Sequence, residues 1–286
     1  MWVIFALLSA LFAGITTILS KIGVKNVGSD TATAIRTVVV LIFSWIVVFL
    51  FGGEKDVPNL SAKTVLFLVL SGLATGGSWL CYFKALKIGD VNKVVPIDKS
   101  STILTMIIAF IFLHEKITVL KVICMVLIAL GTYMMIENKK EQGSASFKSN
   151  YLVWAVLSAI FAALTSILGK LGVSGINSSL GTAIRTIVVL IPAWCTAIVR
   201  EGSGNIKTAS KKDFAFLVLS GITTGLSWLC YYKALRDGQA SIVAPIDKLS
   251  ILVTIAFSRI VLKERLTKKS ASGLVLLTAG TLLLLI

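Results

Sequence analysis

The sequence predicts an all-α integral membrane protein of ten transmembrane helices, arranged as two inverted five-helix repeats. The first observation behind this expectation is composition. Of the 286 residues, 56% are hydrophobic and 14% are charged, and the mean hydropathy is +0.93, whereas about 25% of the residues in a globular protein are charged. The second observation is an internal repeat: residues 1–137 align without a gap on residues 150–286, with about 58 identities.

Apolar runs long enough to cross a bilayer follow one another along the whole chain, since about 20 apolar residues span a hydrocarbon core of about 30 Å. The loops between them are too short to form a domain with its own core. The predicted spans are 2–20, 33–51, 65–83, 94–113, 118–136, 151–169, 182–199, 214–232, 242–262 and 268–286. The first span has no basic n-region and recurs in mid-chain, so it is expected to be permanent rather than a signal peptide.

The repeat defines the expected domain organisation. Residues 1–137 form the first five-helix unit, residues 138–149 a hydrophilic linker, and residues 150–286 the second unit. Because five is an odd number of crossings, the second unit enters the membrane from the opposite side. The two units are then inverted repeats, an architecture that serves alternating access. A fused pair of units completes its own cavity, which predicts a monomer.

The net charge of +15 is carried mainly by Lys and Arg residues in the loops. This distribution indicates contact with anionic lipid headgroups rather than with nucleic acid. With the N-terminus outside, 16 of these cations lie in cytoplasmic loops and 7 on the other side, so the charge bias predicts that both termini are outside. No P-loop, metal-ligand pattern or catalytic motif is present, which predicts a protein that is not an enzyme and needs no cofactor or metal.

Ionisable residues within the predicted spans recur at equivalent positions of both repeats, although each costs at least about 2.5–3.5 kcal/mol on insertion scales. The strongest case is the segment PIDK at 96–99 and 245–248. A helix that restarts at the proline would place the aspartate in its first turn, where the helix dipole favours a carboxylate. Each lysine could bind an anionic substrate group, reach the membrane surface, or pair with a carboxylate of the other repeat.

Further polar residues share helix faces with aromatic ones. The segment AIRT places an arginine in the second and seventh spans. Its guanidinium either binds a substrate carboxylate or phosphate, pairs with an aspartate, or reaches the membrane surface. A stripe of Ser, Thr and Tyr in the third and eighth spans lies beside a tryptophan and could form a substrate wall. The same spans contain Gly-x-x-x-Gly, which instead favours helix packing. The candidate substrate-binding and coupling residues are Asp98, Lys99, Asp247, Lys248, Arg36, Arg185, Trp79, Trp228, Tyr82, Tyr231, Ser101 and Ser250.

The two halves resemble the EamA family of the drug/metabolite transporter superfamily. Each half has a third span of the type GxSWLCYxKAL and a fourth span that closes on E-[KR]-[IL]-T. The resemblance implies a ten-helix transporter with a central cavity lined by both halves. It also implies termini inside the cell, against the charge bias described above. The charged PIDK segment departs from the usual family pattern and favours a charged substrate or proton coupling.

The expected function is therefore secondary transport of a small metabolite across the plasma membrane by alternating access, with membrane lipid as the surroundings. The substrate would be an amino acid, another charged or zwitterionic compound, or an amine. Coupling to protons and export from the cell are both compatible with the residues. The alternatives are a flippase for a lipid-linked substrate and a membrane scaffold that transports nothing.

Overall fold

The computed structural model describes all residues except 24–26, 89–93, 95–96, 136–149, 202–209 and 262–266. The described residues form α-helices and one short 3-10 helix, and they contain no strand. In chain order the elements are α1 (Trp2–Gly23), α2 (Ser29–Leu50), η1 (Gly53–Asn59), α3 (Ala62–Ile88), α5 (Ser101–Phe112), α6 (Val119–Met134), α7 (Asn150–Val173), α8 (Ser178–Glu201), α9 (Lys211–Asp237), α10 (Ala240–Asp247), α11 (Ser250–Val261) and α12 (Lys268–Leu283).

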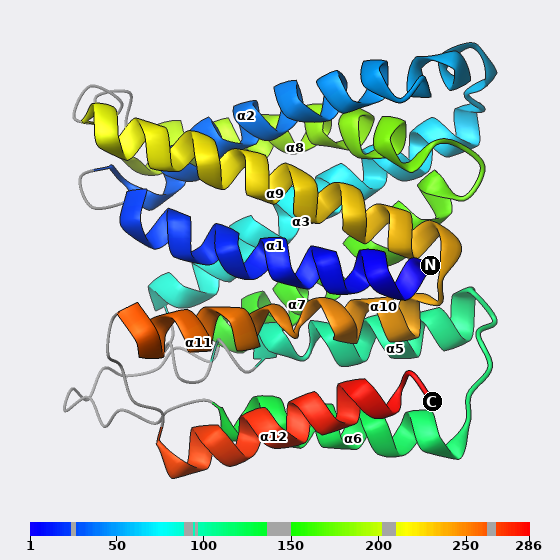
Figure 1. The fold of residues 1–286 in the computed structure, drawn as a ribbon, viewed down its shortest axis with the longest axis vertical. Helices are drawn as coiled ribbons and strands as arrows, with labels where there is room; N and C mark the ends of the chain where they lie inside the picture. The colour runs from blue at the N-terminus through cyan, green and yellow to red at the C-terminus, as the bar shows by residue number, and fades with distance from the viewer. Residues whose placement is uncertain (24–26, 89–93, 95–96, 136–149, 202–209, 262–266) are drawn as a thin grey trace.

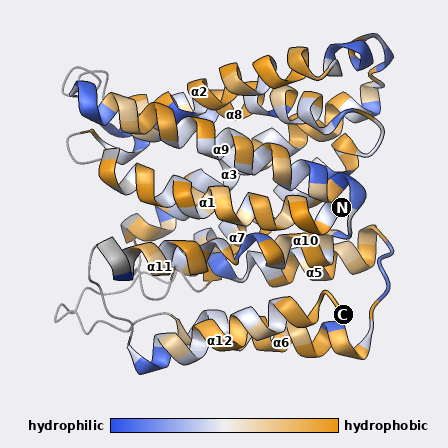
Figure 2. Ribbon diagram, viewed as in Figure 1, coloured by the Kyte–Doolittle hydropathy of each residue, from blue (hydrophilic) through white to orange (hydrophobic). Residues whose placement is uncertain are grey.

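Seven helical segments among the described residues are long and apolar enough to cross a membrane, and α6 is a shorter apolar helix. Hydrophobic residues extend along the helices, and hydrophilic residues gather at their ends (Figure 2). The N- and C-termini lie on the same side of the molecule, where helix α1 begins and helix α12 ends (Figure 1). The structure confirms an all-helical protein with several membrane-spanning helices, while ten crossings stay a prediction.

The two halves of the chain pack extensively against each other. Helix α1 lies along α9, α3 along α7, α2 along α8, and α6 along α12. The helices α6 and α12 are side by side at one end of the molecule, and α2, α8 and α9 lie at the other (Figure 1). Each of these four pairs joins a helix of residues 1–137 to a helix of residues 150–286, so most helices of each half take part in the contact between the halves.

Glycines set the distance between several of these helices. An added Cβ at Gly72 of α3 would lie 2.7 Å from the Val188 Cβ of α8. An added Cβ at Gly221 of α9 would lie 2.6 Å from the Val39 Cβ of α2. These glycines open the two predicted Gly-x-x-x-Gly segments, and Pro192 packs in the same way against Gly76. The two Gly-x-x-x-Gly segments therefore allow close packing between helices.

The second PIDK segment interrupts its span. Helix α10 ends at Asp247, Lys248 is its C-cap, and α11 begins at Ser250. The expectation that a helix restarts at Pro245 and places Asp247 in its first turn is wrong, because Pro245 lies inside α10 and the aspartate closes that helix. In the first half, Asp98 and Lys99 are helical and α5 begins at Ser101, but Pro96 lies outside the described residues.

The E-[KR]-[IL]-T segment has a structural role at the start of the following helix. The hydroxyl of Thr118 accepts a hydrogen bond from the Lys121 N–H and caps α6, and Thr267 accepts one from the Ser270 N–H and caps α12. A threonine at this position satisfies a backbone donor that has no partner within the helix. Glu264 of the second segment and the predicted linker 138–149 lie outside the described residues.

Candidate functional site

Three cavities near the PIDK segments are lined by residues of both halves. Their volumes are about 340, 300 and 390 Å³. Lys248 lines all three, and Lys99 lines the first and the third. Ser78 and Trp79 line both the second and the third. Because they share these side chains, the three cavities are adjacent, and together they are called the polar region here after the charged side chains that line them.

The second and third cavities are lined by equivalent residues of the two repeats. Cavity two contains Arg185, Trp228, Tyr231, Asp247 and Lys248. Cavity three contains the five residues at the same positions of the first repeat, which are Arg36, Trp79, Tyr82, Asp98 and Lys99. Ser101 also lines the third cavity, and Ser250 lines the first. Every candidate residue chosen from the sequence therefore lines one of the three cavities.

Each PIDK aspartate is held by a serine of the opposite half. The Ser158 hydroxyl of α7 donates to Asp98 Oδ1 over 2.7 Å. The Ser9 hydroxyl of α1 donates to Asp247 Oδ1 over the same distance of 2.7 Å. Hydrogen bonds to an ionised acceptor are stronger than neutral ones. The two equivalent bonds tie α1 and α7 to the PIDK segments of the other half.

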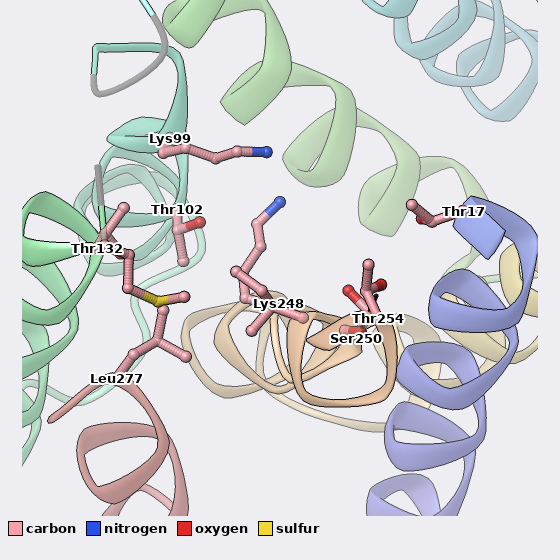
Figure 3. A pocket seen from close by; sticks show the side chains of 10 residues that line it. Thr17, Lys99, Thr102, Thr132, Lys248, Ser250, Thr254 and Leu277 are labelled. Atoms are coloured by element: carbon pink, nitrogen blue, oxygen red, sulfur yellow. Dashed lines mark hydrogen bonds between the residues drawn. The ribbon is translucent and has the colours of Figure 1, made fainter. Parts of the chain in front are cut away.

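The two PIDK lysines line the first cavity without an ion pair among the described residues. Figure 3 shows the side chains of Lys99 and Lys248 reaching into the cavity from different segments, with their ammonium groups converging on the same part of it. Thr102 and Thr254 add hydroxyl groups nearby (Figure 3). Pairing of each lysine with a carboxylate of the other repeat was one of the three alternatives, and it is not seen in the described part of the chain. Two such cations in one cavity are able to bind an anionic group.

Arg185 is a buried cation with hydroxyl and aromatic neighbours. Its side chain is among the most buried of the chain, with 2% of the residue exposed. Nη2 donates to the Thr75 hydroxyl over 2.6 Å, and Nε donates to the Ser71 hydroxyl over 3.3 Å. The guanidinium lies 4.6 Å from the Tyr232 ring centroid and 5.1 Å from that of Trp228, distances at which rings stabilise a cation. No carboxylate pairs with it among the described residues.

The equivalent arginine of the first half has a different setting. Arg36 Nη1 donates to the Ser20 hydroxyl over 2.7 Å. The position equivalent to Ser20 is Gly169, where an added Cβ would lie 2.4 Å from Tyr232 Cε1. The glycine therefore makes room for the Tyr232 ring beneath Arg185. The two ends of the polar region are alike in sequence but not identical in structure.

The polar stripes of α3 and α9 face the opposite half. The Ser78 hydroxyl donates to the Ser158 carbonyl over 3.1 Å, and the Ser227 hydroxyl donates to the Ser9 carbonyl over 3.1 Å. Tyr231 shares a hydrogen bond of 2.8 Å with Ser166 of α7. The stripes thus both line the cavities and hold the halves together. Among the described residues, no group of three His, Cys, Asp or Glu side chains could hold a metal ion.

A carboxylate of the first half, that of Glu115, joins the first half to the start of α10 and to α7 of the second half. Glu115 Oε1 accepts the Ala240 N–H over 2.7 Å, and Oε2 accepts the Ser241 N–H over 3.0 Å, so Glu115 caps the start of α10. Lys170 of α7 lies 3.2 Å from Oε1. Burial raises the pKa of Glu115, but the bonds from Ser241 and Ala240 and the charge of Lys170 outweigh it and lower the pKa below 4.5.

A second set of charges joins the halves between α8 and α2. Arg200 Nη1 lies 2.9 Å from Asp30 Oδ2. Glu201 accepts the N–H groups of Asp30 and Thr31 over 3.0 and 2.9 Å, and so receives the first donors of α2. Arg200 also lies 4.6 Å from the Phe83 ring centroid. The Arg200 cluster and the Glu115 cluster are each built across the two halves.

Several residues of this site were not among the candidates. Ser9 and Ser158 donate hydrogen bonds to the aspartates. Serines are common in apolar spans and carry no charge, so nothing in the local sequence sets these two apart. Their identity at equivalent positions of the repeat was the available signal, since Ser9 and Ser158 align. Glu115 contacts residues 125 positions away, and no local pattern predicts such a partner.

The fold and the cavities define a helical membrane protein with a charged, polar interior site bordered by two homologous halves. Comparison with known families agrees, because the EamA-like transporter family matches residues 1–137 and again residues 149–286. The chain belongs to the EamA-like transporter family. The resemblance that the sequence motifs indicated is confirmed.

Relatives of known sequence extend this result. An uncharacterized transporter from a Sinorhizobium species is 43% identical over 134 residues, which are 47% of this chain and 95% of that protein. That relative is therefore about as long as one half. An uncharacterized transporter of Archaeoglobus fulgidus is 24% identical over 92% of this chain and 90% of its own length. A solved crystal structure matches with a TM-score of 0.81 at 14% identity, over 99% of this chain and 96% of that one, which supports the fold.

Proposed function

We propose that this protein is a secondary transporter that moves a small charged metabolite across the membrane by alternating access. The observation that carries the proposal is the pair of equivalent cavities that share Lys248 and the Ser78–Trp79 wall. A site lined equivalently by two halves can be opened toward either side when the halves rock against each other. The membership of the EamA-like transporter family supports the same conclusion.

The proposal includes the architecture expected from the sequence, which is ten crossings in two inverted units, working as a monomer in the plasma membrane. The clusters of Glu115 and Arg200 support it, because each joins the two halves, and Asp30 of the Arg200 cluster also lines the third cavity. If the contacts of one cluster break while those of the other stay intact, the cavities would open toward one side of the membrane at a time. Proton coupling through Asp98 and Asp247 and outward transport belong to the same hypothesis.

Reconstitution into liposomes tests the proposal. Purified protein is loaded into vesicles with one compound of a panel that contains amino acids, dicarboxylates, sugar phosphates and diamines. Exchange against the same labelled compound outside is then measured. A transporter gives counterflow for at least one class, and a pH jump accelerates it if protons are coupled. If exchange of every class is no faster with the protein than in empty vesicles, secondary transport is contradicted. Selective movement of a labelled lipid between the two leaflets would instead indicate a flippase.

A further inference from the structure

The polar region contains more positive than negative charge. Its cations are Lys99, Lys248, Arg36 and Arg185, and its carboxylates apart from the Asp30–Arg200 pair are Asp98 and Asp247. Four positive charges against two negative ones leave an excess of two. The two aspartates already accept serine hydroxyls, and no ion pair joins them to the lysines in the described part of the chain. Among the residues that the structure describes, no further carboxylate lines the cavities to balance this charge.

The two lysines form one place for an anionic group. Their ammonium groups converge on the same part of the cavity (Figure 3). Two like charges that lie close together repel each other. An anion placed between them replaces this repulsion with two attractions. Carboxylate and phosphate oxygens accept hydrogen bonds from ammonium groups at close range.

Arg185 forms a second place in the adjacent cavity. It lines the cavity of about 300 Å³ that Lys248 also lines. Its Nε and Nη2 are used by Ser71 and Thr75, while Nη1 has no hydrogen bond among the described residues. The rings of Trp228 and Tyr232 hold the guanidinium plane in place. The Nη1 group of a guanidinium fixed in this way can donate hydrogen bonds to a carboxylate or a phosphate.

From this arrangement we infer that the substrate is a small organic dianion, with one acidic group between Lys99 and Lys248 and the second at Arg185. The inference rests on the proposed transport function and narrows its substrate class. Two negative charges balance the excess of two positive charges in the site. A cavity of about 300 Å³ lies at the lower end of the range for small-molecule sites, which favours a compact molecule over a lipid.

Binding is measured first, independently of transport. The protein is placed in nanodiscs of phosphatidylcholine and titrated with succinate and glycerol 3-phosphate as dianions, butyrate as a monoanion and putrescine as a dication. We expect both dianions to bind and to raise the unfolding temperature. Butyrate should bind at least about tenfold more weakly than succinate, which corresponds to about 1.4 kcal/mol, and putrescine should not bind. Putrescine or butyrate binding as tightly as succinate would overturn the inference.

Variants locate the binding site. Lys248→Gln should weaken succinate binding at least about tenfold, and Lys99→Gln should do the same. Lys212→Gln removes an equal charge from the exposed start of α9 and should leave the affinity unchanged. If a glutamine variant does not fold, Lys248→Arg keeps the charge and should retain binding within about threefold. Unchanged succinate affinity in folded Lys99→Gln or Lys248→Gln would contradict the assignment.

Two further comparisons separate the outcomes. Adding phosphatidylglycerol to the nanodiscs should leave the affinity for succinate unchanged. A weaker affinity would show that the site binds a lipid headgroup, and it would overturn the proposal of a soluble dianion as substrate. Binding of succinate without counterflow would count against secondary transport and leave the dianion site standing. Counterflow of putrescine alone would leave transport standing and refute the dianion.

Discussion

Replacing Glu115 by glutamine tests how one carboxylate holds the two halves together. In the wild type, Glu115 is 6% exposed and accepts two backbone N–H groups of α10 while pairing with Lys170. Glutamine keeps the shape but loses the charge, and it can present only one carbonyl oxygen. Loss of a helix cap costs about 1 kcal/mol, and a hydrogen bond to a charged group contributes about 1.5–3 kcal/mol. We expect Glu115→Gln to lower the free energy of unfolding by about 2–3 kcal/mol.

The assay is thermal unfolding in detergent, followed by tryptophan fluorescence, with wild type and variants in parallel. The control is Asp237→Asn, which breaks the half-exposed pair of Lys233 and Asp237 within α9 and should change stability by less than about 1 kcal/mol. Because Lys170→Met removes the partner, the double variant should lose less than the sum of the two single variants. A stability of Glu115→Gln within about 0.5 kcal/mol of the wild type would refute the reasoning.

The pH dependence has a defined sign. The pKa of Glu115 is lower in the folded protein than its ordinary value of 4.5. Its stabilising contribution is therefore complete above about pH 4.5 and is lost as the pH falls through the folded-state pKa. The difference in unfolding temperature between wild type and Glu115→Gln should be constant from pH 8 to pH 6 and should shrink below pH 4.5. A difference that grows on acidification would contradict the arrangement.

Three further substitutions test the packing and the cavity. Gly221→Ala places a methyl group 2.6 Å from the Val39 Cβ and should cost about 1–3 kcal/mol of stability; unchanged thermal unfolding would argue against the close contact of α9 and α2. Ser158→Ala removes the hydroxyl that Asp98 accepts and should cost about 1–3 kcal/mol, measured in the same way, with equal stability as the contradicting result. Arg185→Lys keeps the charge but loses the guanidinium fork, and succinate titration should show at least about tenfold weaker binding; wild-type affinity would exclude Arg185 from the site.

Much of the fold could be predicted because membrane insertion and gene duplication leave strong patterns. Apolar runs, and a repeat that aligns without a gap, predict an all-helical protein with paired halves. Charged residues in apolar spans predicted where the cavities lie, since a charge in a membrane needs a partner or a polar space. The shared lining by Lys99 and Lys248 follows from their equivalent positions.

The parts that could not be predicted depend on tertiary contacts. The proline rule placed Asp247 at the start of a helix, yet Pro245 lies in the last turn of α10 and the break comes at Lys248 and Leu249. A proline is compatible with several helix positions, and packing decides among them. The cap that Glu115 provides to α10 joins segments far apart in the chain, which no local periodicity reports.

Access to the cavity from the two membrane faces tests the central claim most directly. In a variant whose four native cysteines are replaced by alanine, Ser250→Cys places one thiol in the cavity lined by Lys99 and Lys248. An impermeant maleimide is applied to either face of oriented vesicles, with Ile187→Cys on the exposed side of α8 as the unlabelled control. Alternating access predicts that Ser250→Cys is labelled from both faces. Labelling from one face alone, or from neither, would contradict the account.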